Sequence, residues 1–277
     1  MDVSYGIDLA GYSTGKTRIA RLQKDANGSD VHASLLTSGA LLKKRDGNHK
    51  YFQTIIQEEL DELVGFLKEG SIYVDIPVDL QQLGRWRAFE NLWEQTNRPI
   101  DYALNAMPPL ADRIGSPVAR FQTILAYGRT LGGAYDISKL VGKTIFETYP
   151  AASLKFSNIK AQGYKNSTAI WQDGAWVIKS ITKENEPSQQ AFSRILKWLC
   201  CEAVSEGFEL TNDDLDAIIA ALPGIVPAQC LIGNQELEDI IRRHLEEKQT
   251  TTQQSLLPNG FAIIKHQPFS RITVNRG

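Results

Sequence analysis

The first 70 residues contain three short strand-like segments with glycine-containing links, followed by one long amphipathic segment. Residues 3–9, 17–22 and 31–37 are apolar or alternate between apolar and polar side chains, a pattern typical of strands. Because their links are short, we predict an antiparallel three-strand meander. Apolar residues then recur every three or four positions over 52–67, which predicts a helix that ends at Gly70.

The rest of the chain mixes strand-like and helix-like segments. Residues 71–76 and 144–149 predict two further strands, each ended by a proline, and the C-terminal end predicts one or two short strands. Hydrophobic periodicity predicts helices at 80–93, 118–131, 192–204, 213–222 and 237–245. We expect an irregular loop at 99–117, a polar linker at 249–257, and an ambiguous stretch at 161–187 in which Asp173-Gly174 favours a hairpin.

This order predicts an α/β fold. A meander followed by βα units indicates a mixed sheet with helices on both faces. A length of 277 residues suits one large domain or two small ones. We interpret the chain as a single domain over 1–277, with a helical and loop insertion around 80–142 and a C-terminal extension around 234–277.

Composition excludes several classes of protein. The net charge of −2 excludes nucleic-acid binding through bulk positive charge, although a local basic groove remains compatible with it. We find neither an apolar run of membrane-spanning length nor a basic start followed by an apolar stretch, so we expect no membrane and no secretory signal. The three cysteines are odd in number and two are adjacent, which favours reduced, buried thiols and a cytoplasmic protein.

Five acidic residues lie in apolar segments, where burial of a charge costs free energy. Asp8, Asp75 and Glu147 lie near the C-terminal ends of apolar strands, where ligand sites of α/β sheets gather. Asp213 and Asp216 begin an otherwise apolar helix and share one of its faces, whereas Asp214 points elsewhere. A buried carboxylate is unfavourable unless it is paired or bound to a cation. Converging carboxylates favour the hard cations Mg²⁺ or Mn²⁺.

Each acid also has a structural interpretation. Asp213 fits a helix N-cap, Asp75 fits an acceptor for turn amides, and Glu147 fits a solvent-facing edge strand. The glycine segment Gly11–Gly15 has three residues between its glycines, where the phosphate-binding P-loop has four, and it fits a hairpin link better.

Several motifs resemble those of RNase H-like proteins. GIDLAGYSTG (6–15) resembles the first strand and turn of RNase H-like folds, including Holliday-junction resolvases, and DDLDAIIAAL (213–222) resembles their last acidic motif. VDIPVDL (74–80), ETYPAAS (147–153) and LPNGFAIIKHQP (257–268) resemble the domain-of-unknown-function family numbered four-two-nine, which is described as predicted RNase H-like nucleases. The resemblance extends from residue 6 to about residue 268.

This resemblance implies a role for each matching residue. Asp8 matches the first-strand metal ligand, Asp75 matches the acid after the first long helix, and Asp213 and Asp216 match the terminal acidic pair. Glu147 matches an acid particular to this family. Lys165, in Gly-Tyr-Lys, matches a basic position before the late helix.

The favoured hypothesis is therefore a nuclease that holds two Mg²⁺ or Mn²⁺ ions and hydrolyses phosphodiester bonds of DNA or RNA. Asp8 would bridge the metals, Asp75 and Asp213 or Asp216 would complete the ligands, and Glu147 would hold a metal or orient water. Lys165 or the run Lys43-Lys44-Arg45 would meet phosphate, although such a run is ordinarily a solvated surface. Two alternatives stay open: a non-catalytic binding or scaffold protein on the same fold, and an actin-like phosphotransferase.

Overall fold

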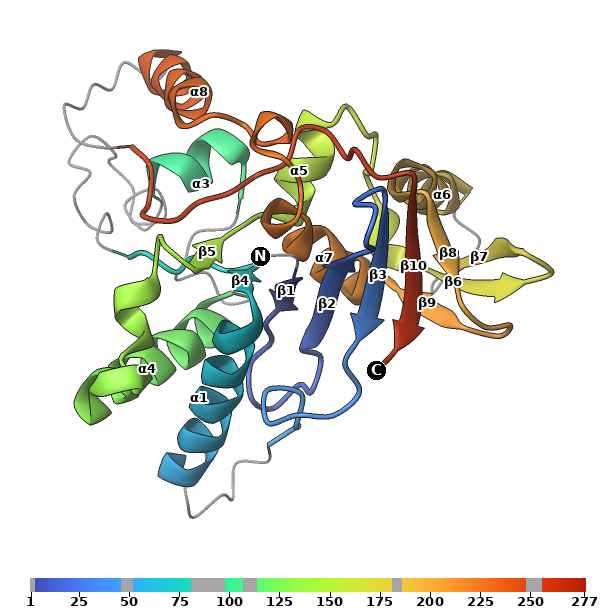
Figure 1. Ribbon diagram of the computed structural model, residues 1–277. Coiled ribbons are helices and arrows are strands. Elements are labelled where there is room, and N and C mark those ends of the chain that lie inside the picture. The colour runs from blue at the N-terminus through green and yellow to red at the C-terminus, as the bar shows by residue number, and fades with distance from the viewer. Residues whose placement is uncertain (1–2, 46–51, 81–97, 107–113, 181–185, 248–255) are drawn as a thin grey trace.

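The computed structural model of the protein describes residues 3–45, 52–80, 98–106, 114–180, 186–247 and 256–277. Within these residues, the larger sheet has seven strands in the order β5-β4-β1-β2-β3-β10-β8 (Figure 1). In chain order they are β1 (Val3–Asp8), β2 (Arg18–Lys24), β3 (Asp30–Leu35), β4 (Ser71–Val74), β5 (Ile145–Glu147), β8 (Cys201–Ala203) and β10 (Arg271–Arg276). A smaller sheet, ordered β7-β6-β9, contains β6 (Ser167–Gln172), β7 (Ala175–Ser180) and β9 (Glu209–Thr211).

The larger sheet is mixed, as the sequence predicts. Strand β2 pairs antiparallel with both β1 and β3, which confirms the meander. Strand β4 pairs parallel with β1, and β5 pairs parallel with β4. On the other side, β10 pairs parallel with both β3 and β8, so the C-terminal end of the chain completes the sheet.

The helices follow the hydrophobic periodicity in most places. They are α1 (Phe52–Glu69), α3 (Pro99–Leu104), α4 (Gly115–Leu131), α5 (Pro150–Phe156), α6 (Glu186–Leu199), α7 (Asn212–Ala221) and α8 (Asn234–Glu247). The predictions at 52–67, 118–131, 213–222 and 237–245 are confirmed. The predicted helix at 80–93 and most of the predicted linker at 249–257 lie outside the described residues. None of the described helices is both long and apolar enough to span a bilayer.

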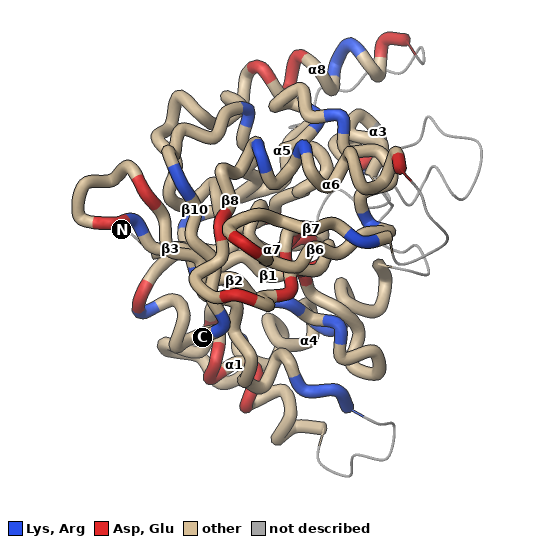
Figure 2. The backbone as a smooth tube through the Cα atoms, turned by 90° about the vertical axis from the view of Figure 1, so that its right-hand side faces the viewer, with Lys and Arg blue, Asp and Glu red and all other residues tan. Residues whose placement is uncertain are grey.

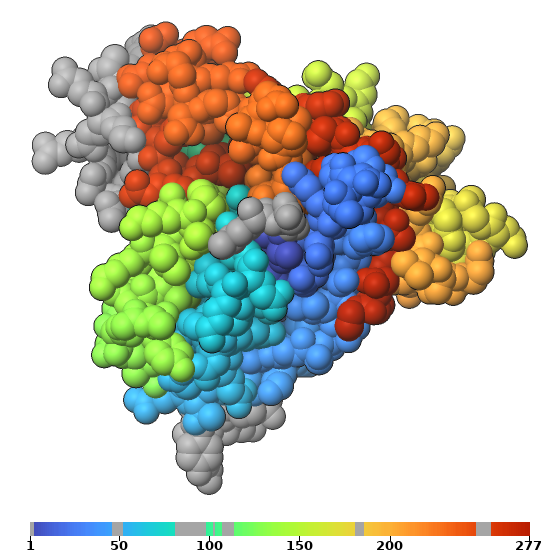
Figure 3. Space-filling model, viewed as in Figure 1, coloured from blue at the N-terminus to red at the C-terminus, as the bar shows by residue number. Residues whose placement is uncertain are grey.

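Helices cover both faces of the sheet. The alternation of side chains along β1 sends Tyr5 and Ile7 into a core formed with α1 and α4, which lie side by side in Figure 3. The Ser4 side chain points to the opposite face of the sheet, and Gly6 exposes its backbone on that face. There α7 lies directly against β1. The prediction of a sheet with helices on both faces is therefore confirmed.

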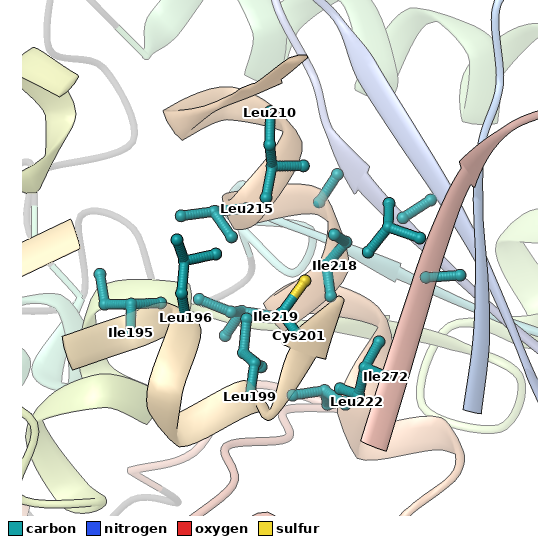
Figure 4. Packing of buried hydrophobic residues seen from close by; sticks show 14 of the residues in the cluster. Ile195, Leu196, Leu199, Cys201, Leu210, Leu215, Ile218, Ile219, Leu222 and Ile272 are labelled. Atoms are coloured by element: carbon teal, nitrogen blue, oxygen red, sulfur yellow. The ribbon is translucent and has the colours of Figure 1, made fainter. Parts of the chain in front are cut away.

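Helix α7 forms the centre of the second core. Leu215, Ile218 and Ile219 are fully buried and pack against α6, β8 and β10 (Figure 4). From residue 214 to residue 221 every side chain of α7 is buried, as its apolar sequence predicts. Because α7 is packed on all sides, its position in the molecule is fixed. The acids at the start of α7 are therefore held in place as well.

The second clear amphipathic segment ends earlier than predicted. Helix α6 stops at Leu199, because Cys200 adopts a left-handed backbone conformation with φ of 49°. The chain then forms β8, whose Cys201 is buried, while Val204 is exposed. Apolar residues at 200–204 continue the helical spacing, but pairing with β10 decides their conformation. Cys200 is exposed, which corrects the expectation that all three thiols are buried; the three cysteines are free.

Prolines account for two other differences. The predicted loop at 99–117 contains α3 and the first turn of α4, with Pro99 as the first residue of α3 and Pro117 in the first turn of α4. The strand predicted at 144–149 ends at Glu147, before Pro150, and Pro150 begins α5. A proline is compatible with the first turn of a helix, where its missing N–H would have no partner. The ambiguous region at 161–187 contains the predicted hairpin, β6–β7, which projects at the right of Figure 3.

Candidate functional site

Asp8 and Asp75 stand side by side at the ends of two parallel strands. In the pairing of β1 with β4, Ile7 lies opposite Val74, and the Asp75 N–H donates to the Ile7 carbonyl at 2.9 Å. The residue after each of these positions is an aspartate. Parallel pairing therefore brings two carboxylates, 67 positions apart in the chain, to the same edge of the sheet.

Helix α7 adds the third carboxylate, and Gly6 allows it to approach. A Cβ atom at Gly6 would lie 2.0 Å from the Ala217 carbonyl oxygen and 2.4 Å from the Ala221 nitrogen. The Ser4 hydroxyl donates to the Ala221 carbonyl at 2.6 Å, which fixes the same contact further along β1. Because the helix lies directly on β1, Asp216 comes near Asp8 and Asp75.

A capping box sets where α7 begins. The Thr211 hydroxyl accepts from the Asp214 N–H at 3.2 Å, and the Asp214 carboxylate accepts from the Thr211 N–H at 3.0 Å. Thr211, and not Asp213, is the N-cap. Asp214 also pairs with Arg276 at 3.0 Å and Arg18 at 3.4 Å, so it points away from the site as predicted. Its role is to hold the helix start against β2 and β10.

Lys165 and Tyr164 contact the acids from a short helical turn at Tyr164–Asn166. The Lys165 ammonium lies 3.1 Å from one Asp216 oxygen, and the Tyr164 hydroxyl donates to the other. Tyr164 is a site residue that sequence reasoning missed. Its only signal is its place beside Lys165 in Gly-Tyr-Lys, and an apolar position of this kind is ordinarily part of a core.

These residues border a common cavity of about 470 Å³. Asp8, Asp75, Asp216 and Lys165 line one part of it, and the other walls come from α5, from the end of α3 and from the start of α4. Lys155 of α5 also lines the cavity and was not predicted. Figure 2 shows acidic and basic positions interspersed over the molecule, with acidic positions beside β1 and α7.

The acids of the cavity hold their protons more tightly than carboxyl groups in water do. Burial raises the pKa of Asp75 to about 7, and the nearby charge of Asp216 acts in the same direction. Burial also raises the pKa of Asp8 well above its ordinary value, with the carboxylates of Asp75, Asp216 and Asp213 adding to the effect. Asp216 has its pKa raised mainly by burial, opposed by the positive charge of Lys165. Mutually repelling carboxylates in an enclosed space are stabilised by positive charge.

Glu147 is used differently from its predicted role as a metal ligand. It is fully buried, which also excludes the solvent-facing alternative. One of its oxygens accepts from Arg98, and the other accepts from Arg98 and from the Val78 N–H, both at 2.8 Å. Arg98 also binds Asp101 and Tyr149. Glu147 therefore belongs to a buried ion-pair network behind the cavity, and we leave it out of the ligand set.

Asp213 lies at the margin of the cluster. It is partly buried, its carboxylate accepts from the Asn212 side chain, and it does not line the cavity. Its charge nevertheless reaches both Asp8 and Asp216 and helps to raise their pKa values. Of the terminal acidic pair, Asp216 is thus the residue that faces the cavity.

The glycine segment and the basic run take structural roles. Residues 11–15 lie in the link between antiparallel β1 and β2, and buried Arg120 donates to the Ala10 carbonyl at 2.7 Å. Arg120 in turn pairs with buried Glu59 of α1 at 2.7 Å. In the run at 43–45, Lys43 and Arg45 pair with Glu58 of the same helix. This run holds the loop on α1 and does not border the carboxylate cavity.

The donor set fits a hard divalent cation, but its members are not arranged as a complete coordination shell. Asp8, Asp75 and Asp216 supply only oxygen ligands, which Mg²⁺ and Mn²⁺ prefer. In the part of the chain that the structure describes, no three Asp, Glu, His or Cys side chains converge closely enough to hold a metal ion. Lys165 and Tyr164 occupy the oxygens of Asp216 instead.

Comparisons of the chain with models of protein families, with curated proteins and with solved structures found no match. The function of the site is therefore inferred from the chemistry of its residues.

Proposed function

We propose that the protein is a divalent-metal-dependent phosphodiesterase acting on nucleic acid, with Asp8, Asp75 and Asp216 as the metal ligands. The observation that carries this proposal is that three acids, from β1, from the end of β4 and from α7, line one cavity. A stabilising ion pair needs one acid and one base, whereas here Lys165 pairs with Asp216, and among the described residues no second lysine or arginine forms an ion pair with Asp8 or Asp75. Such an arrangement costs stability and is expected where a cation binds.

The topology of the sheet supports an RNase H-like arrangement. Strands β1, β2 and β3 form the meander, and β4 and β5 join it in parallel on the side of β1. This is the order of elements that the resemblance implies, and α7 carries its terminal acid. Strands β10 and β8 extend the sheet beyond β3.

Each residue around the cation would have a different role. A divalent cation bound here would activate a water molecule and stabilise the charge that develops on the phosphate. Asp8 is central, because it lies next to Asp75 across the sheet and faces Asp216 of α7. The Tyr164 hydroxyl fixes the orientation of Asp216. Lys165, whose side chain is 61% exposed, reaches both the carboxylates and the open cavity, so it can meet a phosphate oxygen.

One observation favours a second candidate, a binding protein without catalysis. The ammonium of Lys165 already partly balances the carboxylates, and the acids are not arranged as a complete metal shell among the described residues. If Lys165 is the cation that permanently neutralises these acids, the cluster is structural and no metal binds. The two candidates differ in one measurable property, which is affinity for a divalent cation.

Calorimetric titration with Mn²⁺ tests the proposal directly. We expect wild-type protein to bind Mn²⁺ and the variants Asp8→Asn and Asp216→Asn to lose this binding. Asp173→Asn is the matched control, because Asp173 lies exposed at the tip of the β6–β7 hairpin. Binding that survives both site variants, or no binding in wild type even with a phosphodiester present, would contradict the proposed metal site.

Activity is tested next with labelled DNA and RNA oligonucleotides, single-stranded and duplex, in Mg²⁺ or Mn²⁺. We expect cleavage that stops with EDTA and with Asp8→Asn, and that continues with Asp173→Asn. Metal binding without cleavage of any of these substrates would favour a metal-dependent binding protein instead.

A further inference from the structure

A second hollow adjoins the carboxylate cavity. It has a volume of about 790 Å³ and lies between α5 and the turn that carries Lys165. The two spaces share Ala151, Lys155 and Lys165 in their walls, so they lie next to each other. We call the second hollow the lysine groove.

The lysine groove has a charge opposite to that of the cavity. Lys155, Lys160 and Lys165 line it, and all three are exposed. No aspartate or glutamate is among the described residues that form its walls. In a chain with a net charge of −2, Lys155 and Lys160 concentrate positive charge beside Lys165, whose own ammonium pairs with Asp216.

The backbone holds the lysines in place. After α5, Asn158 turns the chain with φ of 58°, and the Ile159 N–H donates to the Leu154 carbonyl at 2.9 Å. The Lys160 carbonyl accepts from the Arg194 side chain of α6 at 3.1 Å. Gly163, with φ of 84°, then turns the chain towards Tyr164. Lys155 therefore stands in α5, Lys160 on an ordered segment that contacts α6, and Lys165 on the turn at Tyr164–Asn166.

We propose that the lysine groove binds the phosphates of a single-stranded nucleic acid and leads the strand to the carboxylates. This inference rests on the proposed function, because it assigns the substrate of the same site. Lys155 and Lys160 present two ammonium groups along the groove, and Lys165, which pairs with Asp216, adds a third at its inner end. A row of ammonium groups matches a chain of phosphates better than one isolated anion. Lys155 and Lys165, at the junction, place the next phosphate beside Asp8, Asp75 and Asp216.

The size of the carboxylate cavity suits a single strand. A cavity of about 470 Å³ is of the size that holds one small-molecule ligand, so it suits one nucleotide of an unpaired strand. Among the described residues that line the groove, Tyr164 is the one aromatic side chain, and it is buried with its hydroxyl on Asp216. The described walls therefore offer bases no exposed ring to stack on, and binding is expected to depend on phosphate and salt, with little sequence preference.

The test is the binding of fluorescein-labelled oligothymidylate and oligouridylate, measured by anisotropy in EDTA so that no cleavage occurs. Lys165 is already paired with Asp216, so the two phosphate contacts of Lys155 and Lys160 predict a slope of about −1.4 for log K against log salt concentration, at about −0.7 for each contact on a single strand. We expect Lys160→Gln to weaken binding several-fold and to bring the slope about 0.7 closer to zero. A blunt duplex of the same length should bind more weakly than the single strand.

Lys160 is the informative position because it lines the lysine groove but not the carboxylate cavity. Lys179→Gln is the matched control, since Lys179 is an exposed lysine of β7 that borders neither space, and it should bind like wild type. Equal affinities of wild type and Lys160→Gln, equal binding of the duplex, or no binding by wild type would each overturn the inference.

Mn²⁺ titration separates this inference from the proposed function. Lys160→Gln should bind Mn²⁺ as wild type does, while it binds the oligonucleotide less well. Oligonucleotide binding that depends on Lys160, together with absence of Mn²⁺ binding, would retain the groove and refute the metal site. Mn²⁺ binding that depends on Asp8, with oligonucleotide binding unaffected by Lys160→Gln, would retain the metal site and refute the groove.

Discussion

Two acids at the ends of neighbouring parallel strands have different partners. Asp75 follows β4 and borders an open cavity, whereas Glu147 ends β5 and is enclosed with Arg98. In the sequence both are acids at the end of an apolar strand, so the residue type does not show which of them borders the cavity. The difference comes from Arg98, a residue 49 positions away from Glu147, whose guanidinium fills the space in front of that carboxylate.

Glu147→Gln is predicted to destabilise the fold and leave the metal site intact. The variant removes one of the two carboxylates, Glu147 and Asp101, that pair with buried Arg98, so the free energy of unfolding should fall by about 3 kcal/mol. Chemical denaturation measures this change, and calorimetry with Mn²⁺ under native conditions should still show binding. Loss of Mn²⁺ affinity without loss of stability would restore Glu147 to the ligand set.

Asp75 is predicted to make stability depend on pH. Its pKa is raised from 3.8 to about 7 in the folded protein, mainly by burial, so the folded state holds this proton more tightly than the unfolded state does. Without metal, the free energy of unfolding should therefore fall as pH rises from about 4 to about 7. In EDTA, the fall should be smaller for Asp75→Asn and unchanged for Asp173→Asn. An identical pH dependence in wild type and Asp75→Asn would contradict the assignment.

At the scale of elements, the contact between β1 and α7 builds the site. A strand can accept a helix this closely only where it has no side chain, and Gly6 supplies that position. The capping box at Thr211 then sets the helix start, so Asp216 faces the cavity while Asp214 faces Arg18 and Arg276. The capping box and the close contact between α7 and β1 at Gly6 together place Asp216 at the cavity.

Gly6→Ala is predicted to disturb both stability and metal binding. The added Cβ would lie 2.0 Å from the Ala217 carbonyl oxygen, so α7 must move away from β1. We expect a loss of about 2 kcal/mol in the free energy of unfolding and weaker binding of Mn²⁺. Gly65→Ala in α1 is the control, because nothing lies within 4 Å of its added Cβ and alanine favours a helix by about 1 kcal/mol. Wild-type behaviour of Gly6→Ala would contradict the close contact.

At the scale of the whole molecule, the two ends of the chain form one sheet. Strand β10 lies between β3 and β8, with six residue pairs to β3. Arg276 also reaches Asp214 at the start of α7. The segment that we expect to be a C-terminal extension therefore contributes a strand to the main sheet and a partner to the helix that carries Asp216.

Val274→Asp and Asn275→Asp test this role of β10 as a matched pair. Val274 is fully buried in the core with α7, whereas its neighbour Asn275 is exposed. Burying a new charge should cost about 3 kcal/mol or more, and the same charge on the surface should change stability by less than about 0.5 kcal/mol. Thermal and chemical unfolding measure both. Equal stability of the two variants would mean that β10 is not part of the cooperative core.

Periodicity in the sequence determined much of the architecture: the meander, α1, α4, α7, α8 and the hairpin at Asp173-Gly174 all follow from local pattern and turn chemistry. It also identified Asp8, Asp75 and Asp216 as unusual, because acids in apolar segments are conspicuous at the level of single residues.

Only the tertiary structure decided how those acids are used. The pairing of Glu147 with Arg98, the contact of Tyr164 with Asp216 and the conversion of residues 201–203 into β8 all depend on segments distant in sequence. Hydrophobic spacing records which side chains are buried, but not which charged group or strand lies against them. Those partners are chosen by packing, after the chain has brought β1, β4, α5 and α7 together.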